Sequence, residues 1–82
     1  MKVEAAYLVG TNPDMFNAGK PARILGVVVC TIREKPKFDR LCYHVLFLDG
    51  AKEDYVPLQD SSNFQIISQS ELDRGKIPKV IR

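Results

Sequence analysis

Residues 43–59 constrain the fold of this chain more than any other segment. From 43 to 47 an apolar or aromatic residue recurs at every second position, which is the period of a β-strand with one buried face. The Asp-Gly pair at 49–50 is typical of a tight hairpin turn, because glycine adopts a positive φ without strain. Residues 55–58 then predict the returning strand. The segment therefore predicts a β-hairpin and, with it, an antiparallel sheet.

The other predicted strands are short segments rich in β-branched and aromatic residues, separated by turn residues. The full set covers residues 3–9, 22–32, 41–48, 55–58 and 64–68. Gly26 lies inside the long second segment, where a glycine usually marks a bulge or a corner. The sequence therefore predicts a mainly β protein with a bent second strand.

Short helical elements are expected toward the C-terminal end. Residues 60–63 predict a single helical turn or a tight loop before the last strand. Ser68 and Glu71 have the spacing of a capping box, in which each side chain binds a backbone N–H at the start of a helix. Gly75 favours a stop, so we expect a helix of one or two turns over residues 69–74.

Length and composition favour one soluble globular domain over residues 1–82. A chain of 82 residues buries only about 60–65% of its unfolded surface, which leaves little room for a deep active site. A hydrophobic content of 45% argues against disorder, and no apolar run is long enough to span a bilayer. The N-terminus does not have the pattern of a signal peptide, and two cysteines are too few for a disulfide framework. We therefore expect a cytoplasmic protein that does not contact membranes.

The order of these elements resembles the SH3-like small β-barrel in its Tudor-like or KOW-like form. Residues 19–28, with a glycine at the bend, are similar to the first strand of such barrels. Residues 43–50 followed by 54–58 are similar to their central hairpin, and residues 59–63 fall where these folds often place a 3₁₀ turn.

The resemblance implies an all-β fold, an SH3-like small barrel of about five antiparallel strands with a short C-terminal helical turn. The barrel core would cover about residues 19–68. The N-terminal strand at 3–9 and the turn and tail at 69–82 would lie outside that core.

Tudor-type modules that bind methylated lysine or arginine use a cage of aromatic rings. This chain has no tryptophan, and only Tyr55, Phe64 and Tyr7 are candidates for such a cage. We expect these rings to be ordinary core and edge residues instead.

Pairing of the two long strands decides which residues share a face. If the connection between them centres near residue 36, the core face holds three facing pairs: Val29 with Tyr43, Val27 with Val45, and Leu25 with Phe47. The opposite face then carries Ile24, Val28, Cys30, Cys42, His44, Leu46 and Leu48.

Half of that opposite face is also apolar, so it needs a cover of its own. Two covers remain open: the chain's N-terminal strand, Met15-Phe16 loop and C-terminal tail, or another protein molecule. The second alternative predicts a small non-enzymatic protein-binding module of the adaptor or inhibitor type, of a kind at home in a phage or other mobile element. Its expected contact residues are Cys42, His44, Leu46 and Leu48, and its partner is an unidentified protein or a second copy.

Basic residues in the connection between the long strands favour a different function, the binding of nucleic acid. Barrels of the KOW-like and some of the Tudor-like type bind nucleic acid, and a ring between basic residues can stack on a base. The residues expected to do so here are Arg33, Lys35, Lys37, Phe38 and Arg40. A net charge of only +2, with an acidic opposite end, counts against this alternative.

No motif in the sequence predicts catalysis or a cofactor. Cys30, Cys42 and His44 form the only grouping with the residue types of a nucleophile or a zinc ligand. A structural zinc site normally uses four protein ligands, which one histidine and two cysteines do not supply. We therefore expect no enzyme activity, no metal site and two unbridged thiols.

Overall fold

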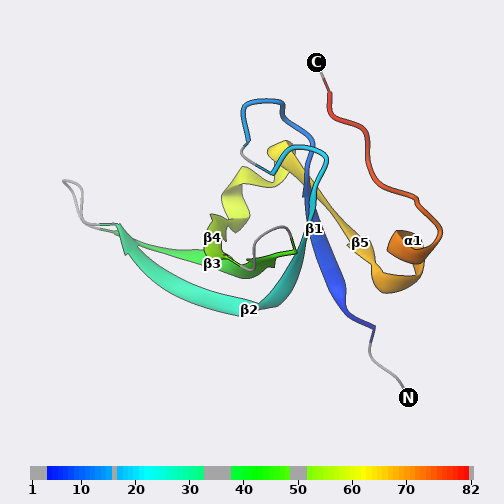
Figure 1. Ribbon diagram of the computed structural model, residues 1–82. Helices are drawn as coiled ribbons and strands as arrows, with labels where there is room; N and C mark the ends of the chain where they lie inside the picture. The colour runs from blue at the N-terminus through cyan, green and yellow to red at the C-terminus, as the bar shows by residue number, and fades with distance from the viewer. Residues whose placement is uncertain (1–3, 16, 33–37, 49–51, 82) are drawn as a thin grey trace.

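The computed structural model describes residues 4–15, 17–32, 38–48 and 52–81. Its elements are β1 (Ala6–Gly10), β2 (Pro21–Ile32), β3 (Phe38–Phe47), β4 (Glu53–Pro57), the 3₁₀ helix η1 (Leu58–Asn63), β5 (Phe64–Ser68) and α1 (Gln69–Asp73). The strands form one antiparallel sheet in the order β4-β3-β2-β1-β5, and β2 bends strongly along its length (Figure 1). The predicted mainly β fold, with five antiparallel strands and a short C-terminal helix, is confirmed.

β1 lies inside the sheet rather than beside it. Tyr7 faces Arg23 of β2 on one side and Ile67 of β5 on the other. Leu8 and Val9 are completely buried, because they point to opposite faces of the sheet and each face packs into its own cluster. The predicted core at residues 19–68 therefore lacks one of the central strands of the sheet.

The main core forms where β1, β2, β3, β4 and β5 converge. Its buried residues are Leu8, Ala22, Val45, Val56 and Phe64. Tyr43 and Phe47 pack against this cluster, as expected for the inward side of β3. The ring of Tyr43 meets the ring of Phe64 edge to face, with 5.9 Å between their centroids.

The opposite face of β1 and β5 has a small core of its own. Tyr7, Val9 and Ile67 are buried there, and Leu72 of α1 packs against them. The hydroxyl of Tyr7 donates a hydrogen bond of 2.5 Å to Oε1 of Gln69, at the start of α1. The C-terminal helix therefore covers β1 and β5, not the hairpin formed by β2 and β3.

The predicted register of β2 against β3 is wrong by two residues. Val27 faces Tyr43 and Val29 faces Leu41. The midpoint of the loop between the two strands therefore lies earlier in the sequence than expected. A bulge between Ile24 and Gly26 adds a further shift, which puts Ile24 opposite Val45 on the core face.

This register has a consequence for three residues that were assigned to the core. Leu25, Val27 and Val29 are 45%, 52% and 63% exposed, so their assignment to the core is wrong. The physical reason is that the other strands of the core end before they reach this part of the hairpin.

The helical elements follow the expected local chemistry. The Ser68 hydroxyl accepts a hydrogen bond from the backbone N–H of Glu71, and the Glu71 carboxylate accepts one from the N–H of Ser68. This capping box confirms the predicted start of α1, and Gly75 follows the helix with a φ of 71°. The predicted Asp-Gly turn at 49–50 lies outside the described residues. Within the part of the chain that the structure describes, no helix is long and apolar enough to cross a membrane.

Two leucine-to-alanine substitutions test where the core ends. Leu8→Ala removes a fully buried side chain and is expected to lower the free energy of unfolding by about 2–5 kcal/mol. Leu41→Ala shortens a side chain that is 53% exposed, and it should change the free energy of unfolding by less than about 0.5 kcal/mol. Urea unfolding of both variants at low micromolar concentration, followed by circular dichroism, measures the difference. Equal losses in the two variants would contradict this description of the core.

Candidate functional site

β2 and β3 continue beyond the core as a two-stranded hairpin. β1 pairs with β2 only as far as Arg23, and β4 pairs with β3 only from Cys42 onward. We call the part that follows the bulge, residues 26–32 of β2 with 38–41 of β3, the arm. Figure 1 shows it extending away from β1, β5 and α1.

One face of the arm is apolar and exposed. Val29 faces Leu41 across the two strands, and Val27 faces Tyr43. Val27, Val29 and Leu41 are 52%, 63% and 53% exposed, and we call these three residues the apolar strip. Since Tyr43 packs against the core, the strip continues the core face of the sheet past the point where the core ends. Leu25, at the bulge, adjoins it.

The residues predicted to bind a partner lie along the other face of β3. Cys42 is buried, with only 3% of its surface exposed, and it faces Pro57 at the end of β4. His44 and Leu46 are half-buried, whereas Leu48 lies beyond the end of β3 and is 54% exposed. Burial removes Cys42 from any surface that a partner contacts in this conformation.

Side chains of the neighbouring strand β4 contact His44. The imidazole Nε2 lies 3.0 Å from a carboxylate oxygen of Glu53, and the ring stacks on Tyr55 with 5.0 Å between centroids. Both partners belong to β4, and Tyr55 is itself 51% exposed, so this face remains partly open to solvent. Of the proposed cage residues, Tyr7 and Phe64 are buried in the cores, which leaves Tyr55 alone on the surface.

The structure describes only part of the segment predicted to bind nucleic acid. Arg33, Lys35 and Lys37 lie outside the described residues. Phe38 begins β3 opposite Ile32, and Arg40 is half-buried opposite Cys30.

A carboxylate also lies within this segment. Asp39 accepts a hydrogen bond of 2.8 Å from the hydroxyl of Thr31. In the sequence, this negative charge stands close to the basic residues that would have to contact phosphates.

The two cysteines are close to each other on the face opposite the strip. Burial raises the pKa of the Cys42 thiol, and its contact with the Cys30 thiol raises it further. The charge of Arg40 acts in the opposite direction, and Asp60 of η1 adds a small increase. A thiol with a raised pKa is a poor nucleophile and a poor metal ligand, because both roles require the thiolate. Both cysteines are unbridged.

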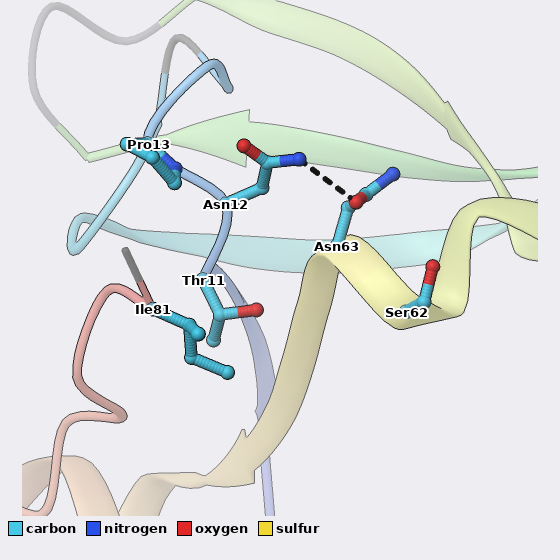
Figure 2. Close-up of a pocket in the computed structure, with 6 residues that line it drawn as sticks. All are labelled: Thr11, Asn12, Pro13, Ser62, Asn63 and Ile81. Carbon is cyan, nitrogen blue, oxygen red and sulfur yellow. Dashed lines mark hydrogen bonds between the residues drawn. The ribbon is translucent and has the colours of Figure 1, made fainter.

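A shallow pocket lies where the loop after β1 meets the end of η1 and the C-terminal tail. It has a volume of about 330 Å³ and is lined by Thr11, Asn12, Pro13, Ser62, Asn63 and Ile81 (Figure 2). The Asn12 amide donates a hydrogen bond of 3.0 Å to the amide oxygen of Asn63, and Figure 2 shows these side chains pointing toward one another.

Backbone hydrogen bonds hold the same region together. The N–H groups of Thr11 and Asn12 donate to the carbonyl of Asn63, and the N–H of Ile81 donates to the carbonyl of Thr11. The lining side chains among the described residues are all neutral, so none of these six is a general acid, a general base or a charge for a substrate. The hydrogen bonds around the pocket join the loop after β1 to the end of η1 and to the C-terminal tail.

Metal chemistry has no cluster to support it in the described part of the chain. No three histidine, cysteine or carboxylate side chains come together there in a way that could hold a metal ion. The apolar strip is thus the feature of the described surface that calls for a functional explanation.

Comparison with protein-family models, with curated proteins and with solved structures found no match to this chain. Function must therefore be inferred from the chain's own surfaces and chemistry.

The raised pKa of Cys42 predicts slow alkylation. At neutral pH, iodoacetamide should modify Cys42 in the folded protein at least about tenfold more slowly than in urea, because burial limits both access and thiolate formation. A Cys30→Ser variant isolates the reaction of Cys42, and a Cys42→Ser variant serves as its control. Mass spectrometry of timed samples measures the rates, and equal rates for Cys42 in folded and unfolded protein would contradict its burial.

Proposed function

We propose that this chain is a small non-enzymatic protein-binding module, of the adaptor or inhibitor type, that binds through the apolar strip of the arm. The observation that carries the proposal is the exposure of Val27, Val29 and Leu41, three neighbouring apolar side chains that no other part of the described structure covers. Exposed apolar patches at one place on a small protein commonly mark interaction sites.

Simple energetics support a role for the strip in binding. Covering the exposed half of a valine or leucine side chain contributes about 1 kcal/mol, from the usual value for complete burial. Three such side chains contribute roughly 3 kcal/mol, which corresponds to about a hundredfold in affinity. The strip is therefore large enough to decide whether a partner binds, although it does not account for a whole interface.

The arrangement of strands supports an SH3-like classification as part of the same proposal. Neighbouring strands follow the order β4-β3-β2-β1-β5, and η1 lies between β4 and β5 where SH3-like barrels often have a 3₁₀ turn. A cytoplasmic location and an origin in a phage or other mobile element remain expectations from the sequence.

Capture of partners from a lysate of the source organism tests the proposal. Tagged wild-type protein should recover a partner that the Val27→Lys and Leu41→Lys variants recover at least about tenfold less, because each places a charge where the partner is apolar. Ile66→Lys is a matched control, since Ile66 is 46% exposed on β5 and lies outside the arm. Quantitative mass spectrometry measures the recovery.

Two outcomes would count against the proposal. Equal recovery by the wild type and both arm variants would exclude the strip as the contact surface. Partners that disappear only after nuclease treatment would favour the alternative, nucleic-acid binding by Arg33, Lys35, Lys37, Phe38 and Arg40.

A further inference from the structure

Among the described residues, one edge of β2 has no neighbouring strand over most of its length. β1 pairs with Pro21, Ala22 and Arg23, and in this part of the chain β3 is the only neighbour of β2 from there to Ile32. Within the described residues, no strand pairs with residues 24–32 on the side away from β3, so this edge of the ladder is open. An unpaired edge of this kind is a template for another strand.

This edge also lacks the features that usually prevent strand addition. Proteins protect exposed edges with charged side chains, prolines or bulges. Residues 26–32 have the sequence Gly-Val-Val-Val-Cys-Thr-Ile, which contains no charge and no proline. The bulge precedes this stretch, and from Gly26 to Ile32 the pairing with β3 is regular. The stretch is about 20 Å long at the usual rise of a strand.

We infer that this edge of β2 pairs with the same edge of a second copy of the chain, antiparallel and centred on Val29. The inference goes beyond the proposed function, because this pairing uses the backbone edge of β2 and not the face that carries the apolar strip. In this register Val29 faces its own equivalent, Val28 faces Cys30, and Val27 faces Thr31. All of these side chains are uncharged, and β-branched pairs across strands are favourable.

The charge pattern favours an identical strand over an unrelated one. A symmetric contact requires a surface that is complementary to itself, and an uncharged edge brings no repulsion when it meets its own copy. A charged partner strand would find no opposite charge along residues 26–32 to offset its desolvation. The pairing also joins the two apolar strips into one continuous face, with Val29 of each copy at the centre.

The dimer should be weak. Edge pairing over about 20 Å buries less accessible surface on each copy than the roughly 800 Å² per partner that a stable complex buries. We therefore expect a dissociation constant on the order of tens of micromolar, so that the dimer forms and dissociates within an accessible concentration range.

Analytical ultracentrifugation tests the inference with the full chain. Between about 1 µM and 1 mM, a range that brackets the expected dissociation constant, the average mass should rise from 9.3 kDa toward twice that value. Val29→Lys brings two like charges together at the centre of the contact and should weaken the dimer at least about tenfold. Val29→Thr keeps the β-branched shape and should retain the dimer within about threefold.

A control and a cross-link make the test specific for this edge. Ile66→Lys is a matched control, because Ile66 is 46% exposed on β5, the strand at one outer edge of the sheet, and it should not change the dimer. In a Cys30→Ser, Cys42→Ser background, Val29→Cys should form a disulfide-linked dimer on mild oxidation, whereas Ile66→Cys should not. Circular dichroism of each variant confirms that it is folded.

The outcomes separate the inference from the proposed function. A mass of 9.3 kDa at every concentration overturns the inference, and the proposed function stands if Val27→Lys still loses a captured partner. A dimer that Val29→Lys leaves unchanged, or that cross-links through Ile66→Cys instead, also overturns it. Loss of both the dimer and every captured partner overturns the two together.

Discussion

The change of partners along β2 is the constraint on which the rest of the structure depends. Up to Arg23 the strand lies between β1 and β3, and from the bulge onward β3 is the one strand of the described structure that pairs with it. The bulge between Ile24 and Gly26 lets Ile24 and then Val27 point to the core side, although they are separated by an odd number of positions. One strand therefore contributes both to the centre of the fold and to an arm that extends from it.

The core and the arm contain the same kinds of residue, and they differ in the number of strands that surround those residues. Val45 and Val29 are both valines on the core face of the same hairpin, yet Val45 is fully buried and Val29 is 63% exposed. Val45 lies where β1, β4 and β5 converge, whereas Val29 has only Leu41 across from it. The same apolar alternation runs through both parts of the hairpin, and it leaves the arm with an exposed apolar face.

Local chemistry made much of the fold predictable from the sequence. The capping box of Ser68 and Glu71 and the bulge at Gly26 both depend on residues close together in the chain. The inward side of β3, with Tyr43 and Val45, follows from its alternation alone.

The candidate site was not predictable in the same way. A register error of two residues leaves the alternation intact, so nothing in the sequence distinguishes Val29 opposite Tyr43 from Val29 opposite Leu41. Exposure of the strip depends on where β1 and β4 stop, which is set by contacts between distant segments. Burial of Cys42 likewise follows from its place opposite Pro57 at the start of η1.

Amide hydrogen exchange of residues 26–32 tests most directly whether this edge is open in the monomer. It is measured by mass spectrometry with residue-level fragmentation at low micromolar concentration. With β3 as the only neighbour, every second N–H in this stretch faces solvent and should exchange nearly as fast as in an unfolded chain. The amides of β1, which has a strand on each side, should be protected. Protection of every amide from 26 to 32 in the monomer would contradict the open edge.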